Sequence, residues 1–369
     1  MSTRRLRVMM STPAIRDTTN PYIVQLVDAV GREVDVQLFS WRSAVLGRYD
    51  VLHVHWPEIF TSASSGPKRW ARRILTSTLQ TRLAVTKTAL VRTAHNERPH
   101  ESTSRVDGAI LRRWNRLTTL WIILNERTHT ETAAERMLIP HGHYRDHFAS
   151  FPRLEATEGL VSVVGHIRPY KGMEELVAAV ADDSGDGAFR LHVAGKPADA
   201  ALGETLTENA SGSDRITLEL DFVDDRRIVE IISTSSLVVL PYRQLHNSGV
   251  ALLALSLDRP VLVPDNAVTR DLQREVGASW VHLLGADTEL TQDIRDALGE
   301  GIPEGSPDLS AREWPLTAHQ HAIAYARAAE VRGGGGGPPG PRGWGGGGRG
   351  GGRGDAERGQ TPPGTPPGG

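Results

Sequence analysis

Short apolar runs alternate with segments of helical periodicity along this chain, and the alternation occurs twice. The runs have the length of buried strands. They lie at 6–10, 34–39, 51–56, 89–94, 119–124 and 137–140, and again at 160–165, 189–194, 216–220, 237–241, 260–263 and 280–284. Strands that alternate with helices form parallel sheets covered on both faces. The sequence therefore predicts an α/β protein with two Rossmann-like domains.

Helical patterns fall between these runs. The first opens with Asn20-Pro21, a capping residue followed by proline at the first helical position. Ile23, Leu26 and Val30 then share one face of the predicted helix. The helices expected in this way lie at 20–31, 172–181, 225–233, 248–257, 287–298 and 310–331.

Composition shifts suggest where the domains end. The stretch 151–158 is polar, contains Pro152 and shows little periodicity, so we expect an interdomain linker there. The segment after Arg332 is mostly Gly, Pro and Arg and cannot bury enough apolar surface to offset its ordering entropy. The expected organisation is an N-terminal domain at 1–150, the linker at 151–158, a C-terminal domain at 159–309, a terminal helix at 310–332 and a disordered tail at 333–369.

Cysteine and charge restrict the classes of function. The chain has no Cys, which excludes disulfides, thiolate zinc sites and Cys nucleophiles. No apolar run approaches 18 residues and the N-terminus lacks the apolar core of a secretory signal, so a cytoplasmic protein is expected. Residues 1–150 carry 22 Lys and Arg against 13 Asp and Glu, and the remainder carries 20 against 31. The basic front half predicts an anionic partner.

Two loops carry the strongest chemical signal. At 164–172 and at 240–249, an apolar strand runs into a loop with cationic side chains and glycine, and then into a helix. Such a turn offers free backbone N–H groups and the positive end of a helix dipole to an anion. Arg168, Lys171 and Arg243 add formal positive charge. Two such loops predict a site for a diphosphate, that of a sugar nucleotide.

The order and spacing of these motifs resemble the GT-B glycosyltransferases, in which two Rossmann-like domains face each other across a cleft. The resemblance covers about residues 4–330 and is closest to the retaining family that includes bacterial mannosyl- and glucosyltransferases (glycosyl transferases group 1). The similar segments are the strand ending in His-x-His at 49–57, the strand ending in His-Asn at 92–100, the segment at 139–144, the Gly-x-x-x-Pro-x-Lys-Gly loop at 165–172, the donor helix region at 248–261 and the Trp314 helix.

Two departures from this family affect the donor site. Many relatives begin the first phosphate loop with Gly-Arg, where this chain has Gly165-His166, so we expect Arg168 to supply that charge. The family usually carries two Glu eight residues apart around the second loop, and Leu245 and Leu253 occupy those places here. The residue that binds the ribose is therefore not identified by this resemblance.

The resemblance implies an enzyme that moves a sugar from a nucleotide-sugar donor, UDP- or GDP-linked, to a glycan or lipid-linked acceptor. Transfer with retention is implied, in cell-surface polysaccharide or glycolipid synthesis. There is no Asp-x-Asp of the kind that chelates a metal–diphosphate, so we expect no metal and no cofactor. Two alternatives are a catalytically silent nucleotide-sugar-binding scaffold and a GT-B sugar-nucleotide epimerase or hydrolase; the missing Glu pair favours the scaffold.

Candidate site residues follow from the loops and from the ends of strands, where α/β folds place ligands. His95, at the end of a predicted strand, is expected to contact the donor sugar. The predicted catalytic residues are His95, Lys171 and Arg168; the donor-binding residues are Gly165, Lys171, Gly172, Tyr242, Arg243, Ser248 and Gly249; and the acceptor-side residues are His53, His55, Glu58, Asn96 and Glu97.

Two Arg- and Trp-rich clusters lie in helical stretches of the first half, at 68–73 and 112–116. A basic helix face with Trp is typical of interfacial membrane binding. We therefore hypothesise attachment to an anionic membrane surface, at the inner face of the cell membrane. The alternative is a solvated basic face with packed Trp side chains. No specific nucleic-acid partner is expected.

Overall fold

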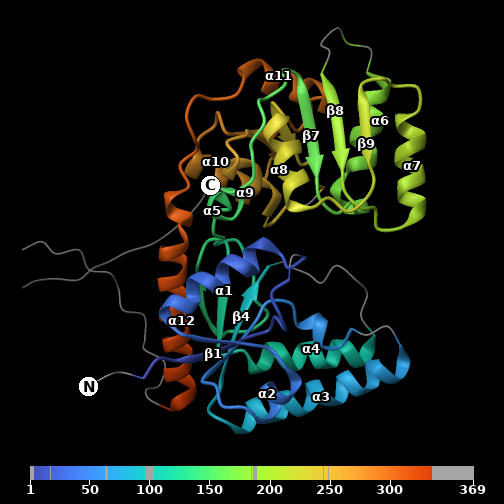
Figure 1. Ribbon diagram of the computed structural model, residues 1–369. Helices are drawn as coiled ribbons and strands as arrows, with labels where there is room; N and C mark the ends of the chain where they lie inside the picture. The colour runs from blue at the N-terminus through green and yellow to red at the C-terminus, as the bar shows by residue number, and fades with distance from the viewer. Residues whose placement is uncertain are drawn as a thin grey trace, which may run out of the picture. The chain divides into compact units, whose positions relative to one another are not determined.

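The computed structural model describes residues 4–334 except 17, 63–64, 96–103, 184, 186–188, 244 and 248. The tail predicted from 333 onward therefore lies outside the described residues, apart from its first two. The described elements form two six-stranded sheets in which every strand pairs in parallel (Figure 1). We call each sheet with its covering helices a lobe.

The first lobe contains the six strands predicted in the first half. They are β1 (Arg7–Met10), β2 (Asp35–Leu38), β3 (Val51–Val54), β4 (Ala89–Ala94), β5 (Leu120–Ile123) and β6 (Glu135–Leu138), in the order β2-β1-β3-β4-β5-β6. The last begins two residues before the predicted run at 137–140.

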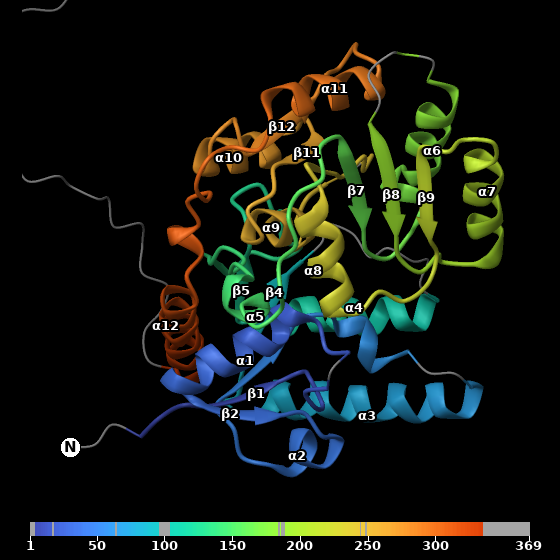
Figure 2. The same ribbon diagram turned by 45° about the horizontal axis from the view of Figure 1, so that its top comes forward.

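Helices cover both faces of this sheet because successive strand residues point to opposite sides. Val51 and Val91 pack with α1 (Pro21–Glu33) and α12 (Trp314–Gly333), while Leu52 and Leu90 pack with α3 (Gly66–Val85) and α4 (Arg105–Leu117). The short α2 (Trp41–Leu46) lies beside α3, and η1 (Pro57–Phe60) follows β3. α12 lies along α1 and the middle of the sheet in both views (Figures 1 and 2).

The second lobe contains the six strands predicted in the second half. They are β7 (Leu160–Val164), β8 (Arg190–Ala194), β9 (Ile216–Glu219), β10 (Leu237–Val239), β11 (Val261–Pro264) and β12 (Val281–Leu284), in the order β12-β11-β10-β7-β8-β9. The order reverses between β7 and β10. Open parallel sheets bind ligands at such a switch point, beyond the carboxyl ends of the strands.

Two layers of helices enclose the second sheet. On one side lie α6 (Met173–Asp182), α7 (Ala200–Ala210) and α11 (Leu290–Glu300), and on the other α8 (Asp225–Thr234), α9 (Gly249–Ser256) and α10 (Ala267–Val276). α9 is buried over most of its length, as its continuous apolar sequence predicts. Its first turn therefore has a fixed position at the switch point.

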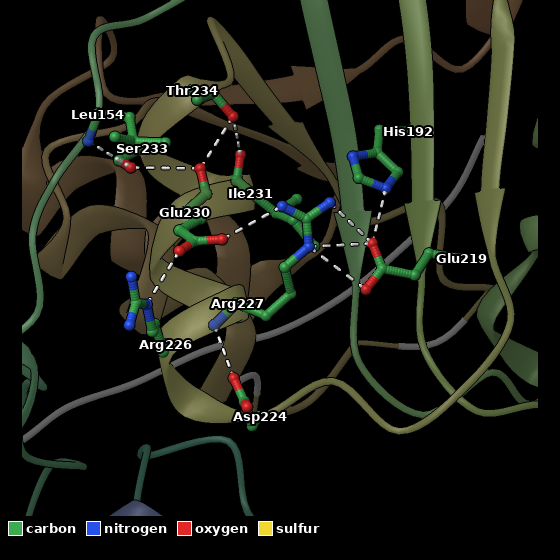
Figure 3. A network of polar contacts seen from close by, with 10 residues as sticks. All are labelled: Leu154, His192, Glu219, Asp224, Arg226, Arg227, Glu230, Ile231, Ser233 and Thr234. Atoms are coloured by element: carbon green, nitrogen blue, oxygen red, sulfur yellow. Dashed lines mark hydrogen bonds and ion pairs between the residues drawn. The ribbon is translucent and has the colours of Figure 1, made fainter.

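A polar network fixes α8 to the sheet and to the linker (Figure 3). Arg227 on α8 reaches Glu219 at the end of β9 at 3.0 Å, and Glu219 also lies 3.4 Å from His192 on β8. At the other end of α8, the Ser233 hydroxyl accepts a hydrogen bond from the backbone of Leu154 at 3.0 Å. The predicted linker is therefore tied to the second lobe.

The terminal helix joins the two lobes. The short α5 (Arg145–Phe148) precedes the linker, and η3 (Ser310–Arg312) precedes α12, which begins at Trp314 rather than at 310 because Pro315 occupies its first turn. The Trp314 indole donates to the carbonyl of His143 at 2.8 Å. A methyl group at Gly142 would lie 2.6 Å from the Trp314 ring. Only glycine allows this close approach of α12 to the segment after β6.

Candidate active site

The two predicted phosphate loops form one structure at the switch point, because β7 and β10 are neighbouring strands. Gly172 has a φ of 67°, which favours glycine, and a methyl group there would lie 2.2 Å from the carbonyl oxygen of Pro241. The backbone N–H of Arg243 donates to the carbonyl of Tyr170 in η2 (Pro169–Lys171) at 3.2 Å. Glycine at position 172 thus allows the loops after β7 and β10 to approach each other closely.

Lys171 is a nearly buried cation in this structure. Its side chain is 9% exposed, and its Nζ lies 5.1 Å from the centroid of the Tyr242 ring. Burial lowers the pKa of Lys171 to about 8, with a smaller contribution from the charge of Arg168. Among the described residues no carboxylate lies within ion-pair distance of Lys171. A buried ammonium without a counter-charge is costly, so this position favours an anionic ligand.

Two exposed cations lie near Lys171. Arg168 and Lys196 both interact electrostatically with His166 and, with Lys171, lower its pKa, although burial has the largest effect. Neither forms an ion pair with a described carboxylate. Lys196 was not predicted as a site residue; the signal was the Gly195-Lys196 pair at the end of β8. The loop after β8 lies against the first phosphate loop, since Ile167 donates to the carbonyl of Lys196 at 3.0 Å.

The start of α9 lies on the other side of Lys171. Gly165 has a φ of 113°, and a methyl group there would lie 3.8 Å from Lys171 Nζ and 3.6 Å from Val250 Cγ2. Val250 is the second residue of α9, so the first turn of this helix lies close to Gly165 and Lys171. Ser248, predicted to open this helix, lies outside the described residues.

Tyr242 and Arg243, predicted donor ligands, have different surroundings. Tyr242 is buried under Lys171, and its hydroxyl has no hydrogen-bond partner among the described residues. Arg243 is exposed and forms an ion pair with Glu175 on α6. Its charge is therefore already balanced, which sequence could not show because Glu175 lies 68 residues away.

The first lobe contacts the loop after β10 through His95, the residue after β4. The Asn247 side chain donates to the backbone carbonyl of His95 at 2.8 Å, and its Oδ1 accepts from Asn125 at 2.8 Å. The neighbouring His246 ring lies 2.9 Å from the Thr128 hydroxyl. These contacts hold the loop after β10 against the ends of β4 and β5. Sequence analysis missed them, because nothing local marks Asn247 as a bridge between lobes.

Aromatic rings surround the His95 side chain. Trp56 stacks on it with centroids 4.5 Å apart, and Tyr22 meets it edge-on at 5.6 Å. Burial lowers the pKa of His95 to about 3, with a contribution from His141, so the ring is neutral near pH 7. His55, a predicted acceptor-side residue, lies directly against it with Nδ1 2.9 Å from His95 Nε2.

Tyr144 connects the two halves of the site. Its hydroxyl lies 3.3 Å from His141 Nε2, and a methyl group at Gly249 would lie 3.0 Å from the same hydroxyl. Gly249 therefore allows the first turn of α9 to approach the first lobe. Tyr22, Tyr144 and His141 were not among the predicted site residues, although the segment at 139–144 was recognised as similar to the family.

His53 and Glu58 have other partners. The His53 ring packs against His55 with centroids 4.3 Å apart, but its nitrogens bond elsewhere. Both ring nitrogens of the buried His53 are engaged, with the Tyr325 hydroxyl and the Thr93 hydroxyl, each at 2.8 Å. His53 thus anchors α12 to the sheet and has no nitrogen left for an acceptor. Glu58 is half-buried and interacts electrostatically with Arg92, whose side chain points to the α3–α4 face of the sheet. Asn96 and Glu97 lie outside the described residues.

A cavity of about 320 Å³ lies beyond the loop after β10, between the end of β5 and α10. Its rim cations are already paired, Arg127 with Asp271 at 3.2 Å and Arg312 with Glu275 at 2.7 Å. Lys171 is the better site for a diphosphate because no described carboxylate neutralises it. Within the described ranges, no three His, Asp or Glu side chains gather as they would around a metal ion. Metal independence stays a prediction.

Comparison with known proteins shows the family of this chain. No family model matches the chain. The chain is 39% identical over 328 residues to the GDP-mannose:glycolipid 4-beta-D-mannosyltransferase of Xanthomonas campestris pv. campestris, an alignment that covers 88% of this chain and 93% of the relative.

Solved structures support the fold. Sucrose-phosphate synthase from Thermosynechococcus elongatus matches with a TM-score of 0.55 at 17% identity, over 89% of this chain and 97% of that one. AviGT4, a glycosyltransferase involved in avilamycin A biosynthesis, matches with a TM-score of 0.55 at 14% identity, over 89% and 98%.

The two parallel sheets have the GT-B fold that the sequence predicted, as the match to these solved structures shows. The chain belongs to the glycosyltransferase family of the Xanthomonas GDP-mannose:glycolipid 4-beta-D-mannosyltransferase. The predicted use of a nucleotide-sugar donor in glycolipid or polysaccharide synthesis is confirmed at this level. The predicted absence of a cofactor stays a prediction.

Proposed function

We propose that this chain transfers mannose from GDP-mannose to a glycolipid and forms a β linkage. The observation that carries this proposal is the 39% identity to a GDP-mannose:glycolipid 4-beta-D-mannosyltransferase over 93% of that protein's length. The buried, unneutralised Lys171 at the switch point supports a diphosphate-linked donor. Arg168 and the first turn of α9 supply further positive potential for the departing diphosphate.

A β product specifies the stereochemistry. The mannose of GDP-mannose is α-linked to its diphosphate, so a β-mannoside forms by inversion. The acceptor hydroxyl then attacks the face opposite the leaving group, and a base takes its proton. This proposal departs from the retention that the family resemblance implied. Of the two carboxylates predicted on the acceptor side, Glu58 interacts with Arg92 on the other face of the sheet, so we assign the role of base to Glu97.

Two experiments test the donor and the linkage. Calorimetric titration with GDP and with UDP should give tighter binding of GDP, and the Lys171→Met variant should lose most of it. Incubation with GDP-[14C]mannose and membranes of the source organism should label an extractable glycolipid, and NMR of the released sugar should show a β-mannoside. Preferential binding of UDP would contradict the donor; an α-mannoside would contradict inversion and leave mannosyl transfer standing.

A second proposal concerns the membrane. The described residues contain no helix whose length and apolarity suffice to cross a bilayer. α3 instead exposes an apolar stripe, with Trp70 59%, Ile74 63% and Val85 78% exposed. These residues line a groove of about 890 Å³ between α3 and α4, whose other lining residues include Arg113 and Arg116. Exposed apolar side chains beside cations fit an anionic membrane surface, where a glycolipid acceptor is found.

Vesicle co-sedimentation tests this surface. The protein should pellet with vesicles of anionic phospholipid at low salt and not with zwitterionic ones. The double variant Trp70→Ser, Ile74→Ser should lose the binding, whereas Ile323→Ser, at an exposed site on α12, should retain it. Equal loss in both variants, or equal pelleting with zwitterionic vesicles, would refute the assignment of α3.

A further inference from the structure

A hydrogen bond between the side chains of His55 and His95 determines which ring nitrogens carry protons. His55 follows β3 and His95 follows β4, so both rings stand at the carboxyl edge of the first sheet. The Nδ1 atom of His55 lies 2.9 Å from Nε2 of His95. Two neutral imidazoles can share a hydrogen bond in only one way at a time, because one nitrogen carries the proton and the other accepts it.

The burial of His55 Nε2 determines which of the two rings donates this hydrogen bond. His55 is 3% exposed, and its Nε2 is buried with no partner among the described residues. If His95 donated, His55 Nε2 would carry a buried N–H with nothing to bond. If His55 donates, that nitrogen is a bare acceptor. Buried donors without a partner are rarer in proteins than buried acceptors without one, so donation by His55 Nδ1 is favoured.

The direction of this bond fixes the tautomer of His95. With Nε2 accepting from His55, the proton of a neutral His95 must sit on Nδ1. Among the described residues Nδ1 has no hydrogen-bond partner, and His95 as a whole residue is half-buried. The backbone carbonyl of His95 is held by Asn247, in the loop that leads into α9. His95 therefore has an N–H group available beside the anion loops.

We propose that His55 is a positioning residue that fixes His95 as a hydrogen-bond donor, with Nδ1–H directed at an oxygen of the nucleotide-sugar. His95 is then a ligand of the donor and not the base for the acceptor hydroxyl, because its Nε2 lone pair is used by His55. An N–H group complements the negative diphosphate or a sugar oxygen, whereas a bare nitrogen would repel it. Trp56, stacked on the ring, limits its rotation.

The tautomer can be read directly. Two-bond 1H–15N correlation spectra of protein labelled with 15N-histidine distinguish a protonated from a bare ring nitrogen, and the His95 signals are assigned by their loss in His95→Asn. We expect Nδ1 of His95 to be protonated and Nε2 bare in the nucleotide-free protein. A protonated Nε2 on His95 would overturn the proposal. This measurement needs no nucleotide, so it is independent of the proposed function on which the donor contact rests.

Matched variants test the role in binding. Asn places its amide nitrogen where Nδ1 of His stands, so His55→Asn keeps the donor to His95 and should keep its Nδ1–H tautomer and most of the GDP-mannose affinity. His55→Leu removes the donor; we expect both tautomers of His95 in the spectrum and about tenfold weaker binding, the effect of one hydrogen bond to a charged group. Equal affinity in these two variants would refute the positioning role.

The variant His95→Asn distinguishes a hydrogen-bond donor from a general base at this position. Asn retains a donor at the Nδ1 position and is not a base. We expect kcat at saturating GDP-mannose to fall by no more than about tenfold, with KM for GDP-mannose raised, because Asn keeps the donor but not the imidazole ring that stacks on Trp56. A fall in kcat of more than about a hundredfold, which is typical for removal of a general base, would show that His95 takes the proton and would overturn the assignment.

Discussion

The pH dependence of GDP binding should report the buried charge of Lys171. In the nucleotide-free protein its pKa is about 8, against an ordinary value of 10.5, because burial disfavours the ammonium. Since one pKa unit corresponds to about 1.4 kcal/mol, the charged side chain is destabilised by about 3 kcal/mol. A bound diphosphate supplies the missing counter-charge, so we expect it to return the pKa toward 10.5. Binding and protonation are then linked.

The size of the effect follows from this shift. Below pH 8 Lys171 is charged before GDP binds, and affinity is insensitive to pH. Above pH 8 a proton must be taken up with GDP, so Kd should rise by about tenfold per pH unit until the pKa of the bound state is reached. Between pH 7 and pH 9 this amounts to about a tenfold loss of affinity, measurable by calorimetry in buffers of different ionisation enthalpy, which also count the protons taken up.

A matched variant isolates the contribution of Lys171. Arg remains charged throughout this range, so Lys171→Arg should bind GDP with a flat profile and no proton uptake. Any pH effect that arises in the nucleotide itself will appear equally in both proteins. If the original protein and the Arg variant follow the same curve, Lys171 is not the group that meets the diphosphate, and the electrostatic argument for the site fails.

Three further outcomes are expected. Lys171→Met should raise the free energy of unfolding of the nucleotide-free protein by about 2 kcal/mol at pH 7 while abolishing GDP binding. Because the pKa of Lys171 is lower in the folded than in the unfolded protein, this gain in stability is full below pH 8 and disappears toward pH 10.5. Chemical denaturation at several pH values measures it. Gly172→Ala should destabilise the protein by about 1–3 kcal/mol and weaken GDP binding, since its methyl group meets the Pro241 carbonyl at positive φ; unchanged thermal unfolding would contradict this. Glu97→Gln should lower kcat at least a hundredfold with little change in GDP affinity, and unchanged kcat would remove Glu97 as the base.

Local pattern was sufficient to predict the strands and the two loops that meet at the switch point. Strands at the switch point are continuous apolar runs, and the glycines and cations that follow β7 are sequence neighbours, so both signals lie within about ten residues. α3 and α4 were recognised only in part, as helical stretches with Arg and Trp at 68–73 and 112–116. α10, with its Asn266 capping box, was not predicted.

The sequence by itself determined the doubly wound sheets and the placing of Gly165, Lys171 and Gly172 between a strand and a helix, because these depend on backbone periodicity and local turn chemistry. Only the tertiary structure decided which charges are free. Arg243 is neutralised by Glu175, and His53 is occupied by Tyr325, 272 residues away. Burial and pairing arise from residues far apart in the chain, and they set the energies on which binding depends.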